Sequence, residues 1–361
     1  MAKKRSSLEQ DIVTLTSMLM RFRSVKDNPS ELKKIIDFVS GFFKGDGLVI
    51  KRFVKNNKHS VVILPKGVRK PKLFFLCHAD VVEADSKDFI PKIKGGNLFG
   101  RGSADMKSGL AIAMLLLKKH KHKPIGLMVT TDEEIGGADG AGLLSKKYSA
   151  DFIIATECSD LRIVNKEKGV FWVKLIATGK SCHSSRPWDG MNAADLLIES
   201  YSHIRKVLPQ LKKEAWKTTM NLGLFNAGKA PNIVPGEAEM VLDIRYTEDY
   251  NTKRLERIIK GAVGKNIKVE VLSRVPLLNN KKNDINIASL GKSIARVLKK
   301  KPELVGEHGA SDARFFAGKA ACVMFGPYGY SLHGKDEHVN IKSCRKCYAV
   351  LEKMVERLSK H

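Results

Sequence analysis

Short apolar runs alternate with helix-length segments through the first half of the chain. The runs lie in SVVILP, KLFFLCHADVV, PIGLMVTT and DFIIATE, and GLAIAMLLLKKH stands between the second and the third. Apolar strands separated by helices indicate a largely parallel sheet that helices cover on both faces. The carboxyl ends of such strands meet at one edge, so polar side chains needed for chemistry are expected there.

The hydrophobic pattern changes from about Val170. Strands in FWVKLIATG, TTMNLGLFNAG, AEMVLDIRY and IKVEVLS combine with helices predicted over residues 193–207 and 252–263. The order strand, helix, strand, strand, helix, strand is typical of a separate ferredoxin-like α+β unit. After Pro276 the α/β pattern resumes, which predicts that this unit is inserted into an α/β domain.

The sequence thus predicts an α/β fold with a mostly parallel sheet flanked by helices and an inserted α+β unit. The predicted segments are 1–168 and 276–361 for the first domain and 169–275 for the inserted one, with hinges near Lys168 and Val275. A chain of 361 residues with 43% hydrophobic content can bury a core of this size.

Targeting signals and bridged cysteines are not expected. The start, MAKKRSSLEQ, lacks the continuous apolar segment of a signal peptide, and the longest apolar stretch, LAIAMLLL, is too short to span a membrane. We therefore expect a cytoplasmic location. The six cysteines include only one CxxC pair, Cys344 and Cys347, which we interpret as reduced thiols one turn apart on a helix rather than half of a zinc ribbon.

The chain is strongly basic, with 64 Lys and Arg against 38 Asp and Glu and a formal net charge of +26. Such a charge suits polyanions, anionic substrates or a generally basic surface, and it does not choose among them. The basic runs KKHKHK and KKK lack interleaved aromatic residues, and there is no helix-turn-helix signature. We expect a solvated basic face and, at most, weak nonspecific binding to nucleic acid.

Imidazoles and carboxylates gather at several predicted strand ends. They occur in CHAD, in TTDEE and in ATE, in the glycine-rich turn LFGRGSADMKSGLA, and near the C-terminus in SLHGKDEHVN, which holds His333, Glu337 and His338. Side chains from these positions are expected to converge on one crevice. Their mixture of nitrogen and oxygen donors suits Zn²⁺ or a similar divalent ion.

Seven motifs in order carry a family resemblance: HADVV, GRGSADMKSG, TTDEEIGG, ATEC, GKSCHSS, GASDARF and SLHGKDEHV. Together they resemble the M20 metallopeptidases, the group of succinyl-diaminopimelate desuccinylase, acetylornithine deacetylase, aminoacylase and glutamate carboxypeptidase. The resemblance spans most of the chain. It implies a zinc-peptidase-like catalytic domain with an inserted dimerisation domain.

The resemblance also implies a centre of two divalent metal ions, Zn²⁺ or alternatively Co²⁺. Asp105 would bridge the ions. The other ligands would be His78 and Glu157 on one ion, and Glu134 and His333 on the other. The C-terminal motif aligns His333 as the ligand and leaves His338 as a neighbour, and a cis peptide bond is implied between Asp105 and Met106.

The neighbouring acids receive roles as well. Glu133 is placed to act as the general base toward a water molecule, and Asp80 to orient the imidazole of His78. Asp132 is expected to orient its loop.

Further roles implied by the resemblance fall mainly in the inserted domain. His183 would reach the partner's active site in a homodimer and donate to the oxyanion. Asn232 and Arg245 would recognise a substrate carboxylate, although a structural ion pair is an equally good account of Arg245. Arg314 would contact the carboxylate or support the crevice. A Cys182–His183 nucleophile is rejected, because adjacent strand residues point to opposite faces.

The expected activity is hydrolysis of the amide bond of a small anionic N-acyl amino acid, as in a desuccinylase or deacetylase. A metallo-carboxypeptidase or dipeptidase of the same family stays open as an alternative. Glu83 stands where relatives commonly have Pro, and the segment before GRG lacks a frequent Trp, so the substrate is not fixed. An alternative of another class is a non-catalytic basic binding module on the same fold.

Overall fold

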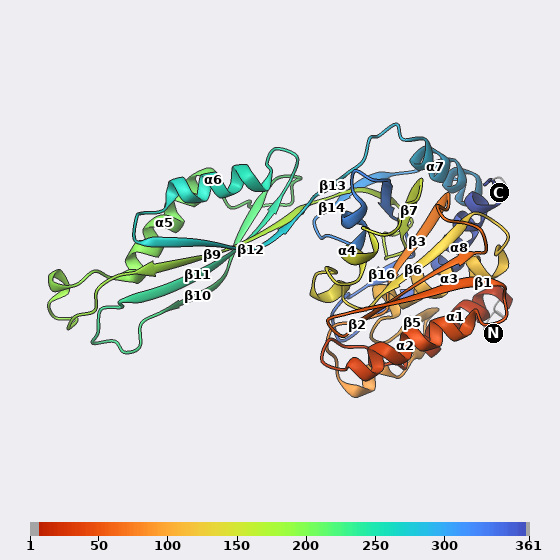
Figure 1. Ribbon diagram of the computed structural model, residues 1–361, viewed down its shortest axis with the longest axis horizontal. Coiled ribbons are helices and arrows are strands. Elements are labelled where there is room, and N and C mark those ends of the chain that lie inside the picture. Colours follow the sequence, from red (N-terminus) through yellow and green to blue (C-terminus); the bar gives the residue numbers. More distant parts are fainter. Residues whose placement is uncertain (1–6, 359–361) are drawn as a thin grey trace. The chain divides into compact units, whose positions relative to one another are not determined.

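The computed structural model describes residues 7–358 (Figure 1). The chain divides into two compact units. The first contains residues 7–166, 280–305 and 311–358, and the second contains residues 167–279 and 306–310. No helix in the described range is long and apolar enough to cross a membrane.

The first unit is built on a mixed sheet with the strand order β1-β2-β6-β3-β7-β15-β8, and β14 also pairs with β8. The strands are β1 (Leu48–Lys55), β2 (Lys58–Pro65), β3 (Leu73–His78), β6 (Ile125–Thr130), β7 (Phe152–Ala155), β8 (Ile163–Glu167), β14 (Leu304–Glu307) and β15 (Ala321–Met324). The central strands β6, β3, β7 and β15 are parallel to one another. Their carboxyl ends therefore lie at the same edge of the sheet.

Helices cover this sheet. They are α1 (Ser7–Met20), α2 (Pro29–Phe42), α3 (Ser108–Lys119), α7 (Ile285–Leu298) and α8 (Ile341–Glu356). These helices share one hydrophobic core with alternate strand residues such as Leu73 and Phe75 of β3. The intervening residue Phe74 points to the other face, where its ring meets Tyr148, which follows the short helix α4 (Ala141–Leu144).

A small antiparallel sheet connects two loops of the first unit. Its strands, in spatial order, are β16 (Gly329–Tyr330), β17 (His338–Asn340), β5 (Asn97–Phe99) and β4 (Lys92–Lys94). Phe99 pairs with His338, and Leu98 with Val339. This pairing fixes where the loop after β5 begins and where the loop before β17 ends. Both loops contain predicted site residues.

The second unit is a four-stranded antiparallel sheet with the order β10-β11-β9-β12. The strands are β9 (Gly169–Thr178), β10 (Thr219–Ala227), β11 (Glu237–Tyr246) and β12 (Ile267–Val275), and the two-residue strand β13 (Leu278–Asn279) follows. Helices α5 (Ala193–Val207) and α6 (Thr252–Ala262) lie on one face of this sheet (Figure 1). Asn192 and Asn251 begin these helices, because each side chain accepts a hydrogen bond from a backbone N–H of the first turn.

The predicted fold class is confirmed: a mostly parallel sheet flanked by helices, with an inserted ferredoxin-like unit. The predicted domain boundaries and hinges stay predictions. No pattern in the sequence predicted that residues 306–310 belong with the second unit. Cys344 and Cys347 are buried, unbridged positions on α8, as expected. The other four cysteines are unbridged too.

Candidate metal centre

The candidate site lies at the carboxyl edge of the parallel strands. His78 ends β3 and pairs with Thr130, which ends β6. The TTDEE acids follow Thr130 directly. Leu76 pairs with Ala155, the last residue of β7, so Glu157 leaves the sheet at the same edge. The ends of these strands therefore meet at one edge of the sheet, as the strand pattern predicted.

Three predicted ligands meet there. One ligand atom from each of His78, Asp105 and Glu134 lies within 4.8 Å of the others. The two carboxylate oxygens of Asp105 face different imidazoles. Asp105 Oδ1 lies 3.0 Å from His78 Nε2, and Oδ2 lies 3.1 Å from His333 Nε2. Since His333 Nε2 is also 3.3 Å from Glu134 Oε2, Asp105 stands between His78 on one side and the His333–Glu134 pair on the other.

The loop geometry explains how Asp105 reaches this position. Gly102 has a φ of +79°, a left-handed conformation that favours glycine, and it turns the chain after β5. Asp105 and Met106 are joined by a cis peptide bond, as the family resemblance implied. Helix α3 then begins at Ser108.

The carboxylates and imidazoles at this position perturb one another strongly. Burial alone would lower the pKa of His78, but Asp105 and Asp80 raise it well above its usual value. Hydrogen bonds to Asp105 and Glu134 raise the pKa of His333 to about 10. Burial would raise the pKa of Asp105, yet the two imidazoles hold it well below its ordinary value. The acids at this edge therefore favour positive charge beside them.

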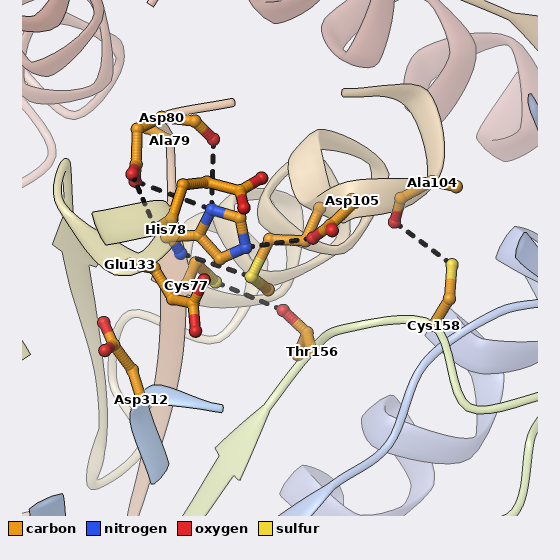
Figure 2. Close-up of polar contacts among 12 residues, drawn as sticks. Cys77, His78, Ala79, Asp80, Ala104, Asp105, Glu133, Thr156, Cys158 and Asp312 are labelled. Atoms are coloured by element: carbon orange, nitrogen blue, oxygen red, sulfur yellow. Dashed lines mark hydrogen bonds and ion pairs between the residues drawn. The ribbon is translucent and has the colours of Figure 1, made fainter. Parts of the chain in front are cut away.

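Glu133, the predicted general base, is buried next to this cluster. Burial, with the nearby carboxylate of Asp312 adding to it, raises the pKa of Glu133 to about 8, although His78 and Arg314 oppose the shift. Figure 2 shows the Glu133 and Asp312 carboxyl groups on the same side of the His78 ring. Arg314 Nη1 lies 3.5 Å from Glu133 Oε1, and its Nη2 donates to the carbonyl of Gly136 at 3.0 Å.

Asp80 faces His78 with both its backbone carbonyl and its carboxylate. His78 Nδ1 lies 3.1 Å from the backbone carbonyl of Asp80 and 3.6 Å from its carboxylate, so the carbonyl is the closer acceptor (Figure 2). The other oxygen of the Asp80 carboxylate, Oδ2, accepts from the backbone N–H of Glu134 at 3.0 Å. Asp80 thus links the His78 and Glu134 loops. Asp132 accepts from the N–H groups of Asp139 and Gly140, both at 2.9 Å, and orders its loop as expected.

The second unit holds His183 and Asn232 on two adjacent segments and Arg245 on β11. His183 forms an isolated bridge with Ile233, and the Ser184 N–H donates to the carbonyl of Asn232 at 3.1 Å. His183 Nδ1 accepts from the Ser185 N–H at 3.2 Å, which in a neutral ring leaves the proton on Nε2. Arg245 makes two contacts with the carboxylate of Asp243, at 2.8 and 3.1 Å, so the ion pair considered from the sequence is present.

Two predicted ligands, Glu157 and His333, lie outside the three-ligand group. Glu157 follows β7, but its carboxylate is not among the atoms within 4.8 Å. His338 is stacked between Phe99 and Tyr330, with ring centroids at 4.4 and 4.9 Å, in keeping with a neighbouring role.

Sequence reasoning missed several buried polar residues around the centre. Thr130 Oγ1 donates to Asp312 at 3.0 Å, and burial raises the pKa of Asp312 to about 7. The Lys107 ammonium donates to the Phe22 carbonyl at 2.9 Å, and burial lowers its pKa to about 7. The buried ion pair Arg101–Glu337 was also missed. The one feature of the sequence that could have pointed to these residues is their position inside or next to the seven family motifs.

Comparison with known proteins settles the family. The model of peptidase family M20/M25/M40 matches residues 74–357. The chain belongs to this family. The M20 assignment makes it a member of a group of hydrolases that act on amide bonds and use divalent metal ions.

Curated relatives of this M20 protein are similar along nearly their whole length. A succinyl-diaminopimelate desuccinylase from Pelagibacter ubique is 28% identical over 380 residues, covering 95% of this chain and 98% of the relative. A protein of the same name from Xanthomonas campestris is 28% identical over 329 residues, covering 81% of this chain and 85% of the relative.

Solved structures agree in fold. A tripeptidase from Staphylococcus aureus matches with a TM-score of 0.82 and 22% identity, covering 98% of this chain and 99% of that one. An M20 family metallo-carboxypeptidase from Sulfolobus solfataricus matches with a TM-score of 0.81 and 18% identity, covering 96% and 98%. At these identities the likeness supports the fold of the M20 chain and not its substrate.

Proposed function

We propose that this protein is a dinuclear-metal-dependent deacylase that hydrolyses the amide bond of a small anionic N-acyl amino acid. The observation that carries the proposal is the position of Asp105. Its two carboxylate oxygens face separate ligand sets, His78 on one side and His333 with Glu134 on the other. A carboxylate in that position suits a bridging ligand between two ions.

The residues present fit divalent metal ions. The donors are imidazole nitrogens and carboxylate oxygens, the set that Zn²⁺ and Co²⁺ accept. We assign His78, Asp105 and Glu157 to one ion and His333, Glu134 and Asp105 to the other. When bound by these residues, divalent ions would supply Lewis acidity toward a substrate carbonyl and would lower the pKa of water enough for it to act as a nucleophile at neutral pH.

In this proposal Glu133 moves the protons. A carboxyl group with a pKa near the working pH can accept a proton from the attacking water and return it to the leaving amine. Burial raises the pKa of Glu133 to about 8, which supports this role. Arg314 lies 3.5 Å from Glu133 and holds the Gly136 carbonyl, so it is better suited to orienting the base than to contacting substrate.

The second unit would bind and polarise the substrate. In a homodimer, His183, with its Nε2 proton free to donate, would reach the partner's active site and stabilise the oxyanion there, and Asn232 on the adjacent segment would contact the substrate carboxylate. Arg245 could also contact the substrate carboxylate, but its guanidinium would then have to leave the Asp243 carboxylate or bind both carboxylates. The N-acyl amino acid is proposed because the relatives at 28% identity are named succinyl-diaminopimelate desuccinylases, and a net charge of +26 would attract such anions.

A homodimer is proposed as well, formed through the second unit. β10 is an edge strand, and Leu224 and Phe225 on it are exposed. Ile198 on α5 is also exposed. Exposed apolar side chains on and near an unpaired edge are typical of an association surface.

A cytoplasmic location also stays a prediction.

The test is reconstitution. Protein stripped of metal with a chelator should not hydrolyse a panel of N-succinyl and N-acetyl amino acids, and added Zn²⁺ or Co²⁺ should restore turnover. Glu133→Gln should bind metal but lose hydrolysis by about 10²-fold to 10⁴-fold. Cleavage of dipeptides in preference to the N-acyl compounds would select the peptidase alternative. A folded protein that takes up no metal, but binds nucleic acid with steep salt dependence, would instead be a binding module.

A further inference from the structure

The ion pair between Arg101 and Glu337 is among the most deeply buried in the first unit. Arg101 is 5% exposed and Glu337 is 1% exposed, and Arg101 Nη1 lies 2.6 Å from Glu337 Oε2. Burying two charges costs several kcal/mol of solvation that their attraction does not always repay. The net contribution of this pair to the free energy of unfolding can therefore be small, and its contacts with the neighbouring loops suggest another role.

Glu337 contacts the loop that carries the bridging carboxylate. Its second oxygen, Oε1, accepts from the backbone N–H of Ala104 at 3.0 Å and from that of Asp105 at 3.1 Å. These bonds hold the main chain of Asp105 itself. They also satisfy N–H groups in an irregular turn, where the ordinary helical acceptors are missing.

Arg101 contacts the loop that carries the opposite ligand. Its second terminal nitrogen, Nη2, donates to the backbone carbonyl of His333 at 3.0 Å. His333 has a positive φ of 63°, a conformation that side-chain-bearing residues rarely adopt without support. The planar guanidinium can bind the Glu337 carboxylate and the His333 carbonyl together because its donors form a fixed fork.

The backbone brings the two loops to the same starting point. Strand β5 ends at Phe99, strand β17 begins at His338, and these two residues pair. The Gly100 N–H then donates to the Glu337 carbonyl at 2.9 Å. Arg101 and Glu337 are therefore the first side chains beyond the ladder that can join the two loops.

We propose that Arg101 and Glu337 form a positioning clamp, which fixes the separation of Asp105 from His333 and so sets the affinity of the centre for one of its two metal ions. The clamp makes hydrogen bonds to the backbone of both ligand residues. This inference rests on the proposed function, since it presupposes a two-ion centre.

Arg101→Lys tests the clamp most directly. Lysine keeps the positive charge beside Glu337 but cannot donate to two acceptors in the same fixed geometry, so the bond to the His333 carbonyl is lost. Calorimetric titration of metal-stripped protein with Zn²⁺ should show two sites in the wild type. In the variant one site should bind about 10-fold to 100-fold more weakly while the other is unchanged, as for other residues that orient ligands.

A second variant and a matched control complete the design. Glu337→Gln keeps an oxygen that can accept from Ala104 and Asp105 but loses the charge that pairs with Arg101, and it should weaken the same site. Arg345→Lys makes the identical change at an exposed arginine, which lies 3.0 Å from the partly buried Glu9, and should leave both sites unchanged. Circular dichroism and urea unfolding of the metal-free proteins would report folding separately.

The outcomes separate the clamp from the proposed function. Two sites of wild-type affinity in folded Arg101→Lys and Glu337→Gln would overturn the clamp, even if both variants unfold at lower urea concentration. Failure of both variants to fold would also overturn it, because the pair would then serve the fold as a whole. A wild-type protein that binds fewer than two ions would refute the two-ion function itself.

Discussion

The backbone at the end of β7 is enclosed by two glycines, and this predicts a sharp response to Gly326→Ala. A Cβ atom on Gly326 would lie 2.0 Å from the carbonyl oxygen of Glu157 and 2.6 Å from its carbonyl carbon. On α3, a Cβ atom on Gly109 would lie 1.9 Å from the Thr156 carbonyl oxygen. The peptide groups on both sides of Glu157 are therefore packed so closely that neither glycine can carry a methyl group without a clash.

The size of the effect follows from these distances. Real Cβ atoms essentially never approach another atom within 3.0 Å, so the Glu157 carbonyl or Gly326 must move by about 1 Å in a closely packed interior. Overpacking of this kind typically costs about 1 to 3 kcal/mol of unfolding free energy. Because Glu157 is a proposed ligand, a displacement of about 1 Å should also lower turnover by about 10²-fold.

Urea unfolding and amide hydrolysis would be measured on Gly326→Ala and on Gly41→Ala. Gly41 lies near the end of α2 with no atom within 4 Å of the added methyl, so that variant should be about 0.5 to 1 kcal/mol more stable, with normal turnover. A Gly326→Ala protein with wild-type stability and turnover would show that the backbone there adapts freely. The packing argument would then be refuted.

Three further changes test other parts of the site. His183→Ala should lower kcat by about 10²-fold to 10³-fold while calorimetry still finds wild-type metal binding, because the side chain is proposed to act only on the oxyanion; weakened metal binding would contradict that role. Arg245→Lys should raise KM with kcat little changed if the guanidinium meets substrate, whereas unchanged kinetics with reduced stability would leave it only the ion pair with Asp243. Asp312→Asn would be tested by urea unfolding in the presence of a chelator. Burial raises the pKa of Asp312 from 3.8 to about 7, so the folded wild type holds a proton that the unfolded chain releases. The wild type should therefore lose unfolding free energy relative to the variant as the pH rises across that range. A difference that does not depend on pH would show that Asp312 ionises normally.

Much of the fold, and the grouping of three candidate ligands, was accessible from the sequence for local reasons. Apolar runs of strand length fixed where the sheet edge lies, and the residues directly after them, His78 and Glu134, had to emerge at that edge. The helix expected over residues 193–207 is α5 with the same limits, because apolar positions recur along one face and Asn192 supplies a clear start.

The remaining features depend on contacts between distant segments. The pairing of β5 with β17 joins residues about 240 positions apart, and short strands of three residues leave little local signal. The Arg101–Glu337 pair depends on that pairing and could not be predicted without it. Likewise, only the fold shows that the backbone carbonyl of Asp80 is the acceptor nearest to His78 Nδ1 and that Asp80 Oδ2 accepts from the Glu134 N–H.

The distribution of the unbridged cysteines makes the protein suited to labelling at one position. Burial raises the pKa of the Cys77, Cys158, Cys344 and Cys347 thiols, and Cys322 is fully buried. Cys158 and Cys182 are each partly open to solvent, but burial raises the pKa of the Cys158 thiol well above its usual value and so keeps it protonated. Because a thiolate is the form that reacts with maleimides, a dye should attach first at Cys182. Its fluorescence would then report substrate binding from the residue next to His183, without any engineered cysteine.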